Sequence, residues 1–330
     1  MSESKIKWGI IGLGNIAHQF VNDLLLVNSA EIVAVASRNK NKAVDFAKQY
    51  DVKKAYGSYD ELLKDEEIDI VYIATPHNSH ASLSINSLEK GKHVLCEKPI
   101  ALNFSEASKM IATSKRTGKF LMEGFWSRFN PSIVDAYTKI IDGKIGDIKY
   151  INAEFAFYVE SPNGTRLADL SLGGGSLLDI GVYPLFLSYL LLGVPESIIA
   201  SAKFFESGAD KQTSMILQYK DAQAVLHSSF VSTSSMTAHI NGEKGRIQIN
   251  PVWHEAQSYD LIINNEKAEF HFPTEGNGFT YEIEECHKCI LNNQIESNIW
   301  SHQNSLELIK IVDEVKHQIG LIYPSDIKKE

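Results

Sequence analysis

The chain of 330 residues contains only three cysteines, which excludes a fold held together by several disulfides. Cys286 and Cys289 are separated by two residues, but residues 281–294 have helical spacing and no second cysteine pair completes a zinc site. Cys96 lies in an apolar run that is typical of a strand. We therefore expect three ordinary, partly buried thiols and no metal site.

Basic residues are in the minority. The 32 lysines and arginines stand against 41 aspartates and glutamates, and the net charge of −9 repels nucleic acid and anionic membranes. The imbalance is uneven, because residues 1–125 contain 16 basic and 15 acidic side chains while residues 126–330 contain 16 and 26. The expected partner is a small molecule, and an anionic cofactor suits the near-neutral first part.

Long apolar runs are missing as well. No stretch approaches the roughly 18 apolar residues that a membrane span needs. Residues Met1–Lys7 are polar and lead into a strand pattern without the apolar core of a signal peptide, so we expect a cytoplasmic protein. With 44% hydrophobic and 22% charged residues the chain is neither disordered nor fibrous, and its length favours two domains.

The first 125 residues alternate short β-branched runs with stretches of helical spacing. The expected strands are Ile6–Ile11, Glu31–Ala36, Ile70–Thr75, His93–Glu97 and Phe120–Gly124. The expected helices between them are Ile16–Val27, Lys40–Tyr50, Tyr59–Lys64, Ser79–Lys90 and Ser105–Thr117. This alternation predicts an α/β domain over residues 1–125, built on a doubly wound parallel sheet.

The pattern changes after Pro131. We expect a helix at Ser132–Ile141, a long strand at Ile148–Tyr158 and a strongly apolar helix around Leu177–Leu192. Further strands are expected at Ser197–Phe205, Ser214–Tyr219, Ala222–Val231, Thr237–Asn241, Arg246–Asn250, Tyr259–Ile263 and Ala268–Phe272. They predict an α+β domain over residues 126–330, with a large, open, mostly antiparallel sheet. Helices at Phe279–Asn293 and Ser301–Ile319 follow, and we expect the last of them to pack back on the first domain.

The turn after the first strand contains the pattern G-x-G-x-x-A, at Gly12, Gly14 and Ala17. Gly12 permits a tight turn, Gly14 lets a pyrophosphate approach the backbone, and Ala17 lets the next helix pack close to the strand. The helix N-terminus at Asn15 and Ile16 would face the phosphates. In this strand–turn–helix context the pattern predicts a Rossmann dinucleotide-binding domain.

The second strand ends in Ala36, Ser37 and Arg38, where an NAD-selective protein presents a carboxylate to the ribose 2′-hydroxyl. Ser37 can donate to a 2′-phosphate instead, and Arg38 can neutralise that phosphate while its guanidinium plane lies on the adenine. We therefore expect NADP as the preferred cofactor and NAD as the second choice. The alternative is that Arg38 is a solvated loop residue.

Four further segments follow in order along the chain. Thr75-Pro76-His77-Asn78-Ser79-His80 and Cys96-Glu97-Lys98-Pro99 each follow or end a strand. Glu123-Gly124-Phe125-Trp126-Ser127-Arg128-Phe129-Asn130-Pro131 lies at the expected domain junction, and Gly173-Gly174-Gly175-Ser176-Leu177-Leu178-Asp179-Ile180-Gly181-Val182-Tyr183 opens the apolar helix. Together they resemble the Gfo/Idh/MocA oxidoreductase family over essentially the whole chain. The Asp179 and Tyr183 pairing is most similar to the branch of dimeric dihydrodiol dehydrogenases and NADP-dependent D-xylose dehydrogenases, whereas inositol dehydrogenases have His in place of Tyr183.

This resemblance implies further cofactor contacts. They are Thr75, Pro76, His77, His80, Glu97 and Lys98. It also implies a cis bond between Lys98 and Pro99, which would fix where the ammonium points. His77 and His80 have i, i+3 spacing, but no ligand partners lie nearby, so we expect neither to bind a metal. His80 either lines the nicotinamide pocket or is a surface residue.

Hydride transfer from a carbinol needs a group that moves the hydroxyl proton. Tyr183 is the candidate acid/base, and because a tyrosine normally has a pKa of about 10, a nearby cation must favour its phenolate. Lys98, at the carboxyl end of a strand, can supply that charge. Asp179 precedes Tyr183 by four residues and shares its helix face, where it can bind a substrate hydroxyl and orient the lysine. The alternative is a surface or capping role for Asp179 and Tyr183.

Residues of two other kinds are candidates for substrate binding. The aromatic candidates are Trp126, Phe155, Phe157, Trp253 and Phe279, whose rings can stack on a sugar or an aromatic diol. Core packing is the alternative for each ring. Arg128 either binds substrate or braces the domain junction. The triple glycine at 173–175 suits a close approach of the backbone to cofactor or sugar.

The sequence thus favours an NADP-dependent oxidoreductase that interconverts a secondary or anomeric hydroxyl and a carbonyl on a sugar, polyol or cyclic diol. Two alternatives are oxidation of trans-dihydrodiols and a regulatory protein that senses NADP without turnover. A sensor has no reason to combine Lys98 and Tyr183 with Asp179. A second copy would cover the exposed face of the sheet at 197–272, so we expect a homodimer.

Overall fold

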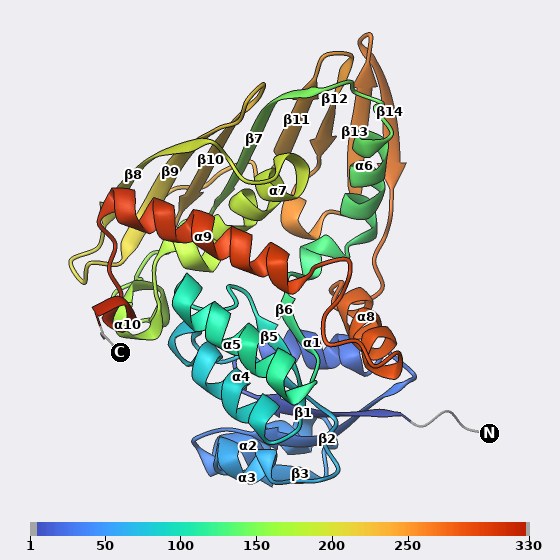
Figure 1. The fold of residues 1–330 in the computed structure, drawn as a ribbon, viewed down its shortest axis with the longest axis vertical. Coiled ribbons are helices and arrows are strands. Elements are labelled where there is room, and N and C mark those ends of the chain that lie inside the picture. Colours follow the sequence, from blue (N-terminus) through green and yellow to red (C-terminus); the bar gives the residue numbers. More distant parts are fainter. Residues whose placement is uncertain (1–4, 328–330) are drawn as a thin grey trace. The chain divides into compact units, whose positions relative to one another are not determined.

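The structure is a computed structural model that describes residues 5–327, and the chain divides into two compact units (Figure 1). The first unit comprises residues through Ala101, Ser105–Trp126 and Glu275–Leu306. The second comprises Leu102–Phe104, Ser127–Thr274 and the residues from Glu307 on. The division differs from a boundary at 125/126, because a late segment belongs to the first unit and the last long helix is shared between the two units. Packing of that helix on the first domain stays a prediction.

The first unit contains a six-stranded parallel sheet in the order β3-β2-β1-β4-β5-β6. Its strands are β1 (Ile6–Ile11), β2 (Ala30–Ala36), β3 (Lys54–Tyr56), β4 (Ile70–Ile73), β5 (His93–Glu97) and β6 (Leu121–Gly124). The helices of this part are α1 (Asn15–Leu24), α2 (Lys40–Gln49), α3 (Tyr59–Leu63), α4 (His80–Glu89), α5 (Phe104–Thr117) and α8 (Thr280–Leu291). The predicted doubly wound α/β fold is confirmed, and the strand order reverses between β1 and β4, the point at which such sheets bind ligands.

Contacts to β1 and α1 explain why the segment with α8 joins the first unit. The Trp8 indole donates to His287 Nε2 over 2.9 Å, and the Asp23 carboxylate accepts the backbone amides of Asn277 and Phe279. The Phe279 ring packs on Phe20 with centroids 5.9 Å apart. These long-range bonds do not produce a sequence periodicity, so a boundary drawn from strand and helix patterns misses them.

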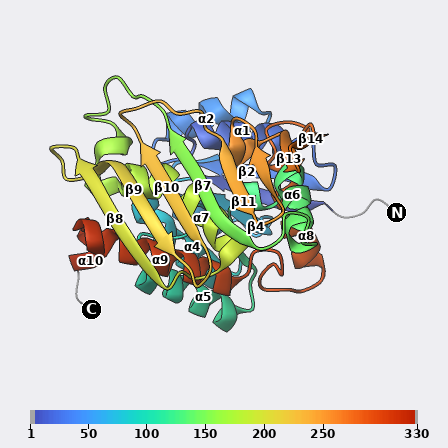
Figure 2. The same cartoon turned by 90° about the horizontal axis from the view of Figure 1, so that it is seen from above.

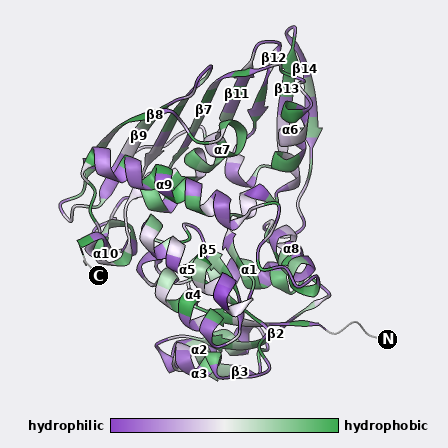
Figure 3. Ribbon diagram, in the orientation of Figure 1, coloured by the Kyte–Doolittle hydropathy of each residue, from purple (hydrophilic) through white to green (hydrophobic). Residues whose placement is uncertain are grey.

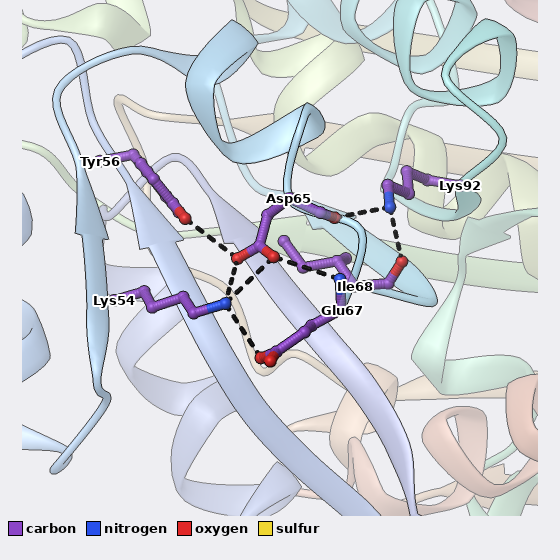
Figure 4. Close-up of polar contacts among 6 residues, drawn as sticks. All are labelled: Lys54, Tyr56, Asp65, Glu67, Ile68 and Lys92. Atoms are coloured by element: carbon purple, nitrogen blue, oxygen red, sulfur yellow. Dashed lines mark hydrogen bonds and ion pairs between the residues drawn. The ribbon is translucent and has the colours of Figure 1, made fainter.

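Strand β3 was not among the expected strands. It has only three residues and pairs along one side with β2. Its Lys54 ammonium binds the Asp65 carboxylate at 2.9 Å and Glu67 at 2.9 Å, and Asp65 also accepts from the Tyr56 hydroxyl (Figure 4). Burial raises the pKa of Asp65, but the hydrogen bonds from Lys54, the Glu67 amide and Tyr56 outweigh it, so the net pKa is lowered. Lys54 and Tyr56 pair with Ala34 and Ala36 of β2, and Asp65 lies in the segment before β4.

The second unit is built on an eight-stranded sheet in the order β14-β13-β12-β11-β7-β10-β9-β8 (Figure 2). Its strands are β7 (Ile148–Ala156), β8 (Ser197–Phe204), β9 (Asp210–Gln218), β10 (Gln223–Ser229), β11 (Ala238–Gly242), β12 (Gly245–Ile249), β13 (Ser258–Ile263) and β14 (Glu266–His271). The helices of this part are α6 (Pro131–Ile141), α7 (Val182–Leu192), α9 (His302–Ile319) and α10 (Pro324–Ile327). Only β7 and β10 pair in parallel, so the predicted mostly antiparallel sheet is confirmed.

One face of this sheet is covered by α7, which is apolar on all sides and largely hydrophobic in Figure 3. Leu170–Leu192 is apolar enough to cross a membrane by composition, contrary to the expectation from the sequence, but 83% of its most apolar window is buried inside the structure. A helix that is hydrophobic all round and buried is a core helix. It fills the space behind strands β7 and β10.

The expected apolar helix around Leu177–Leu192 is present, but its first turn is not α-helical. Leu177–Gly181 form a π-helix, and the α-helix begins only at Val182. Gly181 lies against β10, where an added Cβ would stand 2.9 Å from the Ser228 hydroxyl. A π-turn inserts one residue into the helical register, and such turns are frequent at functional sites. Asp179 is therefore in the π-turn, and Tyr183 follows in the first turn of α7.

Candidate functional site

The cofactor candidates of the first unit lie at the carboxyl ends of neighbouring strands. Gly12 follows β1, Ser37 follows β2, Thr75 follows β4, and Glu97 ends β5. Because β2, β1, β4 and β5 are adjacent in the sheet, the structure brings these residues to one edge. That edge is where doubly wound sheets bind nucleotides.

The glycine turn fits a dinucleotide. Gly12 has a φ of +88°, and a Cβ there would stand 2.6 Å from the Ala74 carbonyl oxygen, so no other residue is accommodated without strain. Gly14, the N-cap of α1, is different, because an added Cβ would meet nothing within 4 Å. Ala17 is fully buried against the sheet. The backbone at Gly14, Asn15 and Ile16 is thus accessible at a helix N-terminus, the environment that a pyrophosphate requires.

The end of β2 has the chemistry of a phosphate site. The Ser37 hydroxyl accepts the Asn39 amide at 3.2 Å and keeps its own proton for another acceptor. Arg38 is exposed and hydrogen-bonds to Tyr59, whose pKa is raised by burial and partly restored by Arg38. This strand end thus has a cation, Arg38, and no carboxylate, which fits a 2′-phosphate.

His80 is buried and spans two segments of this edge, which excludes the surface alternative. Its Nδ1 lies 2.8 Å from the Pro99 carbonyl oxygen and its Nε2 lies 2.9 Å from that of Thr75. Burial lowers the pKa of His80, and the two carbonyl contacts oppose this shift. His80 therefore braces the loop with Thr75, Pro76 and His77 against the Lys98–Pro99 bond, which is cis.

Glu97 is buried at the end of β5, and its carboxylate accepts a hydrogen bond from the Tyr72 hydroxyl at 2.5 Å. Lys98 follows directly. The strand and the hydrogen bond to Tyr72 thus fix the backbone from which the lysine ammonium extends.

Asp179 and Tyr183 belong to the second unit, and both are nearly buried. Arg166, in the short helical turn Arg166–Ala168, donates from Nη1 to Asp179 Oδ1 at 2.9 Å and from Nη2 to Oδ2 at 3.5 Å. The arginine was not a candidate from the sequence, since the pairing joins residues of two different elements without a spacing pattern. The only sequence feature that could have pointed to Arg166 is its place in a polar loop before the glycine run.

The approach of a ligand to the triple glycine before the π-turn stays a prediction, and other parts of the chain lie against two of these glycines. A Cβ on Gly174 would stand 2.4 Å from the Arg166 carbonyl oxygen, and one on Gly175 would stand 2.2 Å from Asp210 Oδ1. The Gly174 amide donates to the Asp169 carbonyl and its own carbonyl accepts from Tyr323. The backbone here is approached by other parts of the chain itself.

Asp210 anchors the start of the π-turn and was also missed. Its Oδ2 accepts from the Ser176 hydroxyl, the Leu177 amide and the Thr213 hydroxyl, all within 2.8 Å. Burial raises the pKa of Asp210, and these three hydrogen bonds oppose the rise. The carboxylate therefore caps the helix that carries Asp179 and Tyr183.

Tyr183 lies in an aromatic cluster with Phe155 and His254. The Phe155 and His254 rings stack with centroids 4.1 Å apart, and the Tyr183 centroid lies 5.5 Å and 5.0 Å from them. The Trp253 indole next to this cluster is fully buried and donates to the Glu154 carbonyl. His254, which no sequence pattern indicates, is thus a neighbour of the candidate acid/base.

The other proposed substrate residues divide by position. Trp126 and Phe279 stack in the first unit with centroids 4.7 Å apart, and Phe279 is fully buried, as core packing requires. Phe157 packs on Phe230 in the second unit. Arg128 lies over the Tyr137 ring, 5.1 Å from its centroid, and burial lowers its pKa. The substrate roles of these residues stay predictions.

The three cysteines are free, and all are buried rather than partly buried. Burial raises the pKa of the Cys289 thiol to about 12, so the thiol is protonated and unreactive at neutral pH. Within residues 5–327, no three His, Cys, Asp or Glu side chains are grouped to hold a metal ion.

The strand order, the accessible glycine turn and the second sheet define an oxidoreductase with an NAD(P)-binding Rossmann domain. The chain belongs to the Gfo/Idh/MocA family. Residues 6–125 match the family model described as oxidoreductase family, NAD-binding Rossmann fold, and residues 134–248 match the GFO/IDH/MocA C-terminal domain.

Named relatives extend over nearly the full chain. The trans-1,2-dihydrobenzene-1,2-diol dehydrogenase of Xenopus tropicalis is 39% identical over 332 residues, which cover 96% of this chain and 99% of that protein. The human protein of the same name is 33% identical over 339 residues, with 97% and 99% covered. The crystal structure of KijD10, a 3-ketoreductase from Actinomadura kijaniata in complex with NADP and TDP-benzene, is similar with a TM-score of 0.88 at 25% identity, covering 96% and 98% of the two chains.

Proposed function

We propose that this protein uses NADP to interconvert a secondary or anomeric hydroxyl and a carbonyl on a cyclic diol, sugar or polyol. The observation that carries the proposal is the similarity to trans-1,2-dihydrobenzene-1,2-diol dehydrogenases, which extends through both units. The NADP in the complex of the ketoreductase and the exposed Arg38 after β2 support NADP as the cofactor.

A bound nicotinamide would supply the hydride acceptor for oxidation of a carbinol carbon and the hydride donor for reduction of a carbonyl carbon. In the direction of oxidation, Tyr183 as phenolate takes the proton of the substrate hydroxyl, and in reduction it gives the proton back. We assign to Lys98 the positive charge that favours the phenolate, and to Asp179 a hydrogen bond from a second substrate hydroxyl. A vicinal diol supplies both hydroxyls.

The test is absorbance of the reduced nicotinamide with NADP⁺ and a panel of trans-dihydrodiols, aldoses and polyols. Tyr183→Phe and Lys98→Ala should each lower kcat by about 10²- to 10⁴-fold, because each loses part of the proton transfer. Tyr158→Phe is the matched control, since this tyrosine is 61% exposed. Absence of turnover on the whole panel in both directions, or full activity of Tyr183→Phe, would contradict the proposal.

A homodimer through the eight-stranded sheet belongs to the same proposal. Ile199 pairs with Ile216, and both remain exposed, at 60% and 36%, on the sheet face away from α7. Apolar residues on an uncovered sheet face favour a partner surface of the same kind. Ile216→Lys should shift the sedimentation coefficient from that of a dimer to that of a monomer. Wild-type protein that already sediments as a monomer would contradict the proposal.

We also propose a cytoplasmic location, which the three free thiols support because such compartments keep thiols reduced. Cell fractionation tests it, and recovery of the protein with membranes or in a secreted fraction would contradict it.

A further inference from the structure

We propose that Arg166 is a positioning residue for the reaction, which orients the Asp179 carboxylate and joins the loop Thr165–Leu172 to the helix that carries Tyr183. This role rests on the proposed function, because it assigns substrate binding to Asp179. Arg166 itself is not assigned a contact with substrate or cofactor.

The first support is the geometry of the ion pair. One guanidinium nitrogen lies 2.9 Å from Asp179 Oδ1, and the second lies 3.5 Å from Oδ2. A planar guanidinium that faces both oxygens fixes the position and the plane of a carboxylate, which a single point charge does not do. Oδ1 therefore accepts the shorter hydrogen bond, and the plane of the guanidinium sets the direction of Oδ2.

The second support is that the same loop is bound by its main chain to the turn before the helix. The Gly174 amide donates to the Asp169 carbonyl and the Gly175 amide donates to the Leu167 carbonyl, each at 2.8 Å. The backbone of Arg166 thus lies next to the glycine turn, and its side chain extends beyond that turn to Asp179. The loop is therefore joined to the helix segment in two ways: by main-chain hydrogen bonds to the glycine turn and by the side-chain bond from Arg166 to Asp179. Only the side-chain bond involves the carboxylate.

The third support is the position of Asp179 in a π-turn. The inserted residue leaves the side chains of this turn outside the regular α-helical register, so their direction depends on bonds to neighbours. Arg166 provides such a bond from a different element. The Arg166 side chain is 52% exposed and that of Asp179 is 10% exposed, so the arginine binds an almost buried carboxylate from the solvent side.

The test compares Arg166→Gln with Arg166→Lys and with Arg116→Gln. Arg116 is the matched control, because it also is a half-exposed arginine in a carboxylate pair, with Glu89 at 2.8 Å, but in the first unit. We expect Arg166→Gln to lower kcat/KM for the diol about tenfold with an unchanged KM for NADP, Arg166→Lys to recover part of the loss, and Arg116→Gln to behave as wild type.

A double-mutant cycle tests whether the effect passes through Asp179. If it does, adding Arg166→Gln to Asp179→Asn should cause little further loss of kcat/KM. Losses that multiply, or a lysine variant no better than the glutamine variant, would overturn the positioning role. Arg116→Gln should keep the wild-type midpoint of thermal unfolding, whereas Arg166→Gln should lower it, because the nearly buried Asp179 carboxylate loses this cation.

Hydrogen exchange separates this inference from the proposed function, because it needs no turnover. Amide exchange in peptides covering residues 165–181 should increase equally in Arg166→Gln and Asp179→Asn, should increase no further in the double variant, and should not change in Arg116→Gln. Unchanged exchange in Arg166→Gln overturns the inference even if the enzyme is active. Inactive wild-type protein with the expected exchange pattern overturns the proposed function and leaves the attachment of the loop supported.

Discussion

Each unit has a glycine-rich turn directly before a helix that bears candidate functional residues, and the two turns differ in what lies against their backbone. At Gly14 in the first unit, an added Cβ would project into open space. At Gly174 and Gly175 in the second unit, it would collide with the Arg166 carbonyl and the Asp210 carboxylate. Glycine leaves open space in the first turn and lets the chain approach itself in the second, and the sequence pattern alone does not distinguish these two situations.

The largest effect should come from Gly175→Ala. Its φ of +122° and the 2.2 Å approach to Asp210 Oδ1 combine backbone strain with a steric clash, and we expect a loss of about 3 kcal/mol or more in the free energy of unfolding. Urea unfolding measures it. Gly164→Ala is the control, because its φ of +79° is also positive but nothing lies within 4 Å, so only about 1 kcal/mol should be lost. Equal losses would remove the contrast between the two turns.

The second largest effect concerns the cofactor edge. Arg38→Ala should raise the KM for NADP by about 10- to 100-fold, because a charge-assisted contact to the 2′-phosphate is lost, and should change the KM for NAD far less. Initial rates with both cofactors measure the difference, with Arg38→Lys as an intermediate. An equal change for both cofactors would contradict the phosphate assignment.

Gly14→Ala sharpens the comparison directly. The methyl group would occupy the space that the pyrophosphate needs, so the Kd for NADP should rise about tenfold or more. The φ of −86° and ψ of −174° at Gly14 suit alanine, and the free energy of unfolding should fall by less than about 1 kcal/mol. Calorimetric titration and urea unfolding give the two values. A large loss of folding free energy together with an unchanged Kd for NADP would contradict our interpretation of this turn.

The smallest effect is expected in the first unit at Asp65, which binds Lys54 and Tyr56 and for which we propose no ligand contact. Asp65→Asn should lower the free energy of unfolding by about 1–2 kcal/mol at pH 7 and leave the kinetic constants unchanged. The pKa of Asp65 is lower in the folded chain, so its stabilisation is complete above the unfolded pKa of about 4 and is lost as the pH falls through the folded pKa. The unfolding free energies of the two proteins should therefore differ at pH 7 and approach each other as the pH falls below about 4, and a difference that grows in acid would contradict the sign.

The regular elements were predictable because their periodicity is local. β1 at Ile6–Ile11 and β5 at His93–Glu97 agree with the expected bounds, since buried parallel strands are continuous apolar runs with turn residues after them. β3 was not predictable, because three half-buried residues are too few to show an alternation of apolar and polar side chains. β9 begins at Asp210 rather than near Ser214, because a buried aspartate at its start is explained only by its bonds to the helix turn.

The site was predictable to the extent that spacing encodes it. The glycine turn and the residues after the strand ends follow from chain order, because parallel strands bring their carboxyl ends to one edge. Arg166, Asp210 and His254 could not be found in this way, since each meets the helix 177–192 or Tyr183 from a distant part of the chain. Long-range side-chain pairing leaves no period in a single sequence.

The central place of β7 in the eight-stranded sheet has a consequence for how the chain folds. β8–β9–β10 and β11–β12–β13–β14 are two antiparallel meanders whose strands are close in sequence, and β7 lies between β10 and β11. Hairpins between neighbouring strands close short loops and form fast, whereas the parallel pairing of Tyr150 with Gln223 must close a loop of about seventy residues. Docking of both meanders on β7 is therefore expected to be the late, slow event of the second unit, and until it occurs the helix with Tyr183 has no completed sheet to rest on.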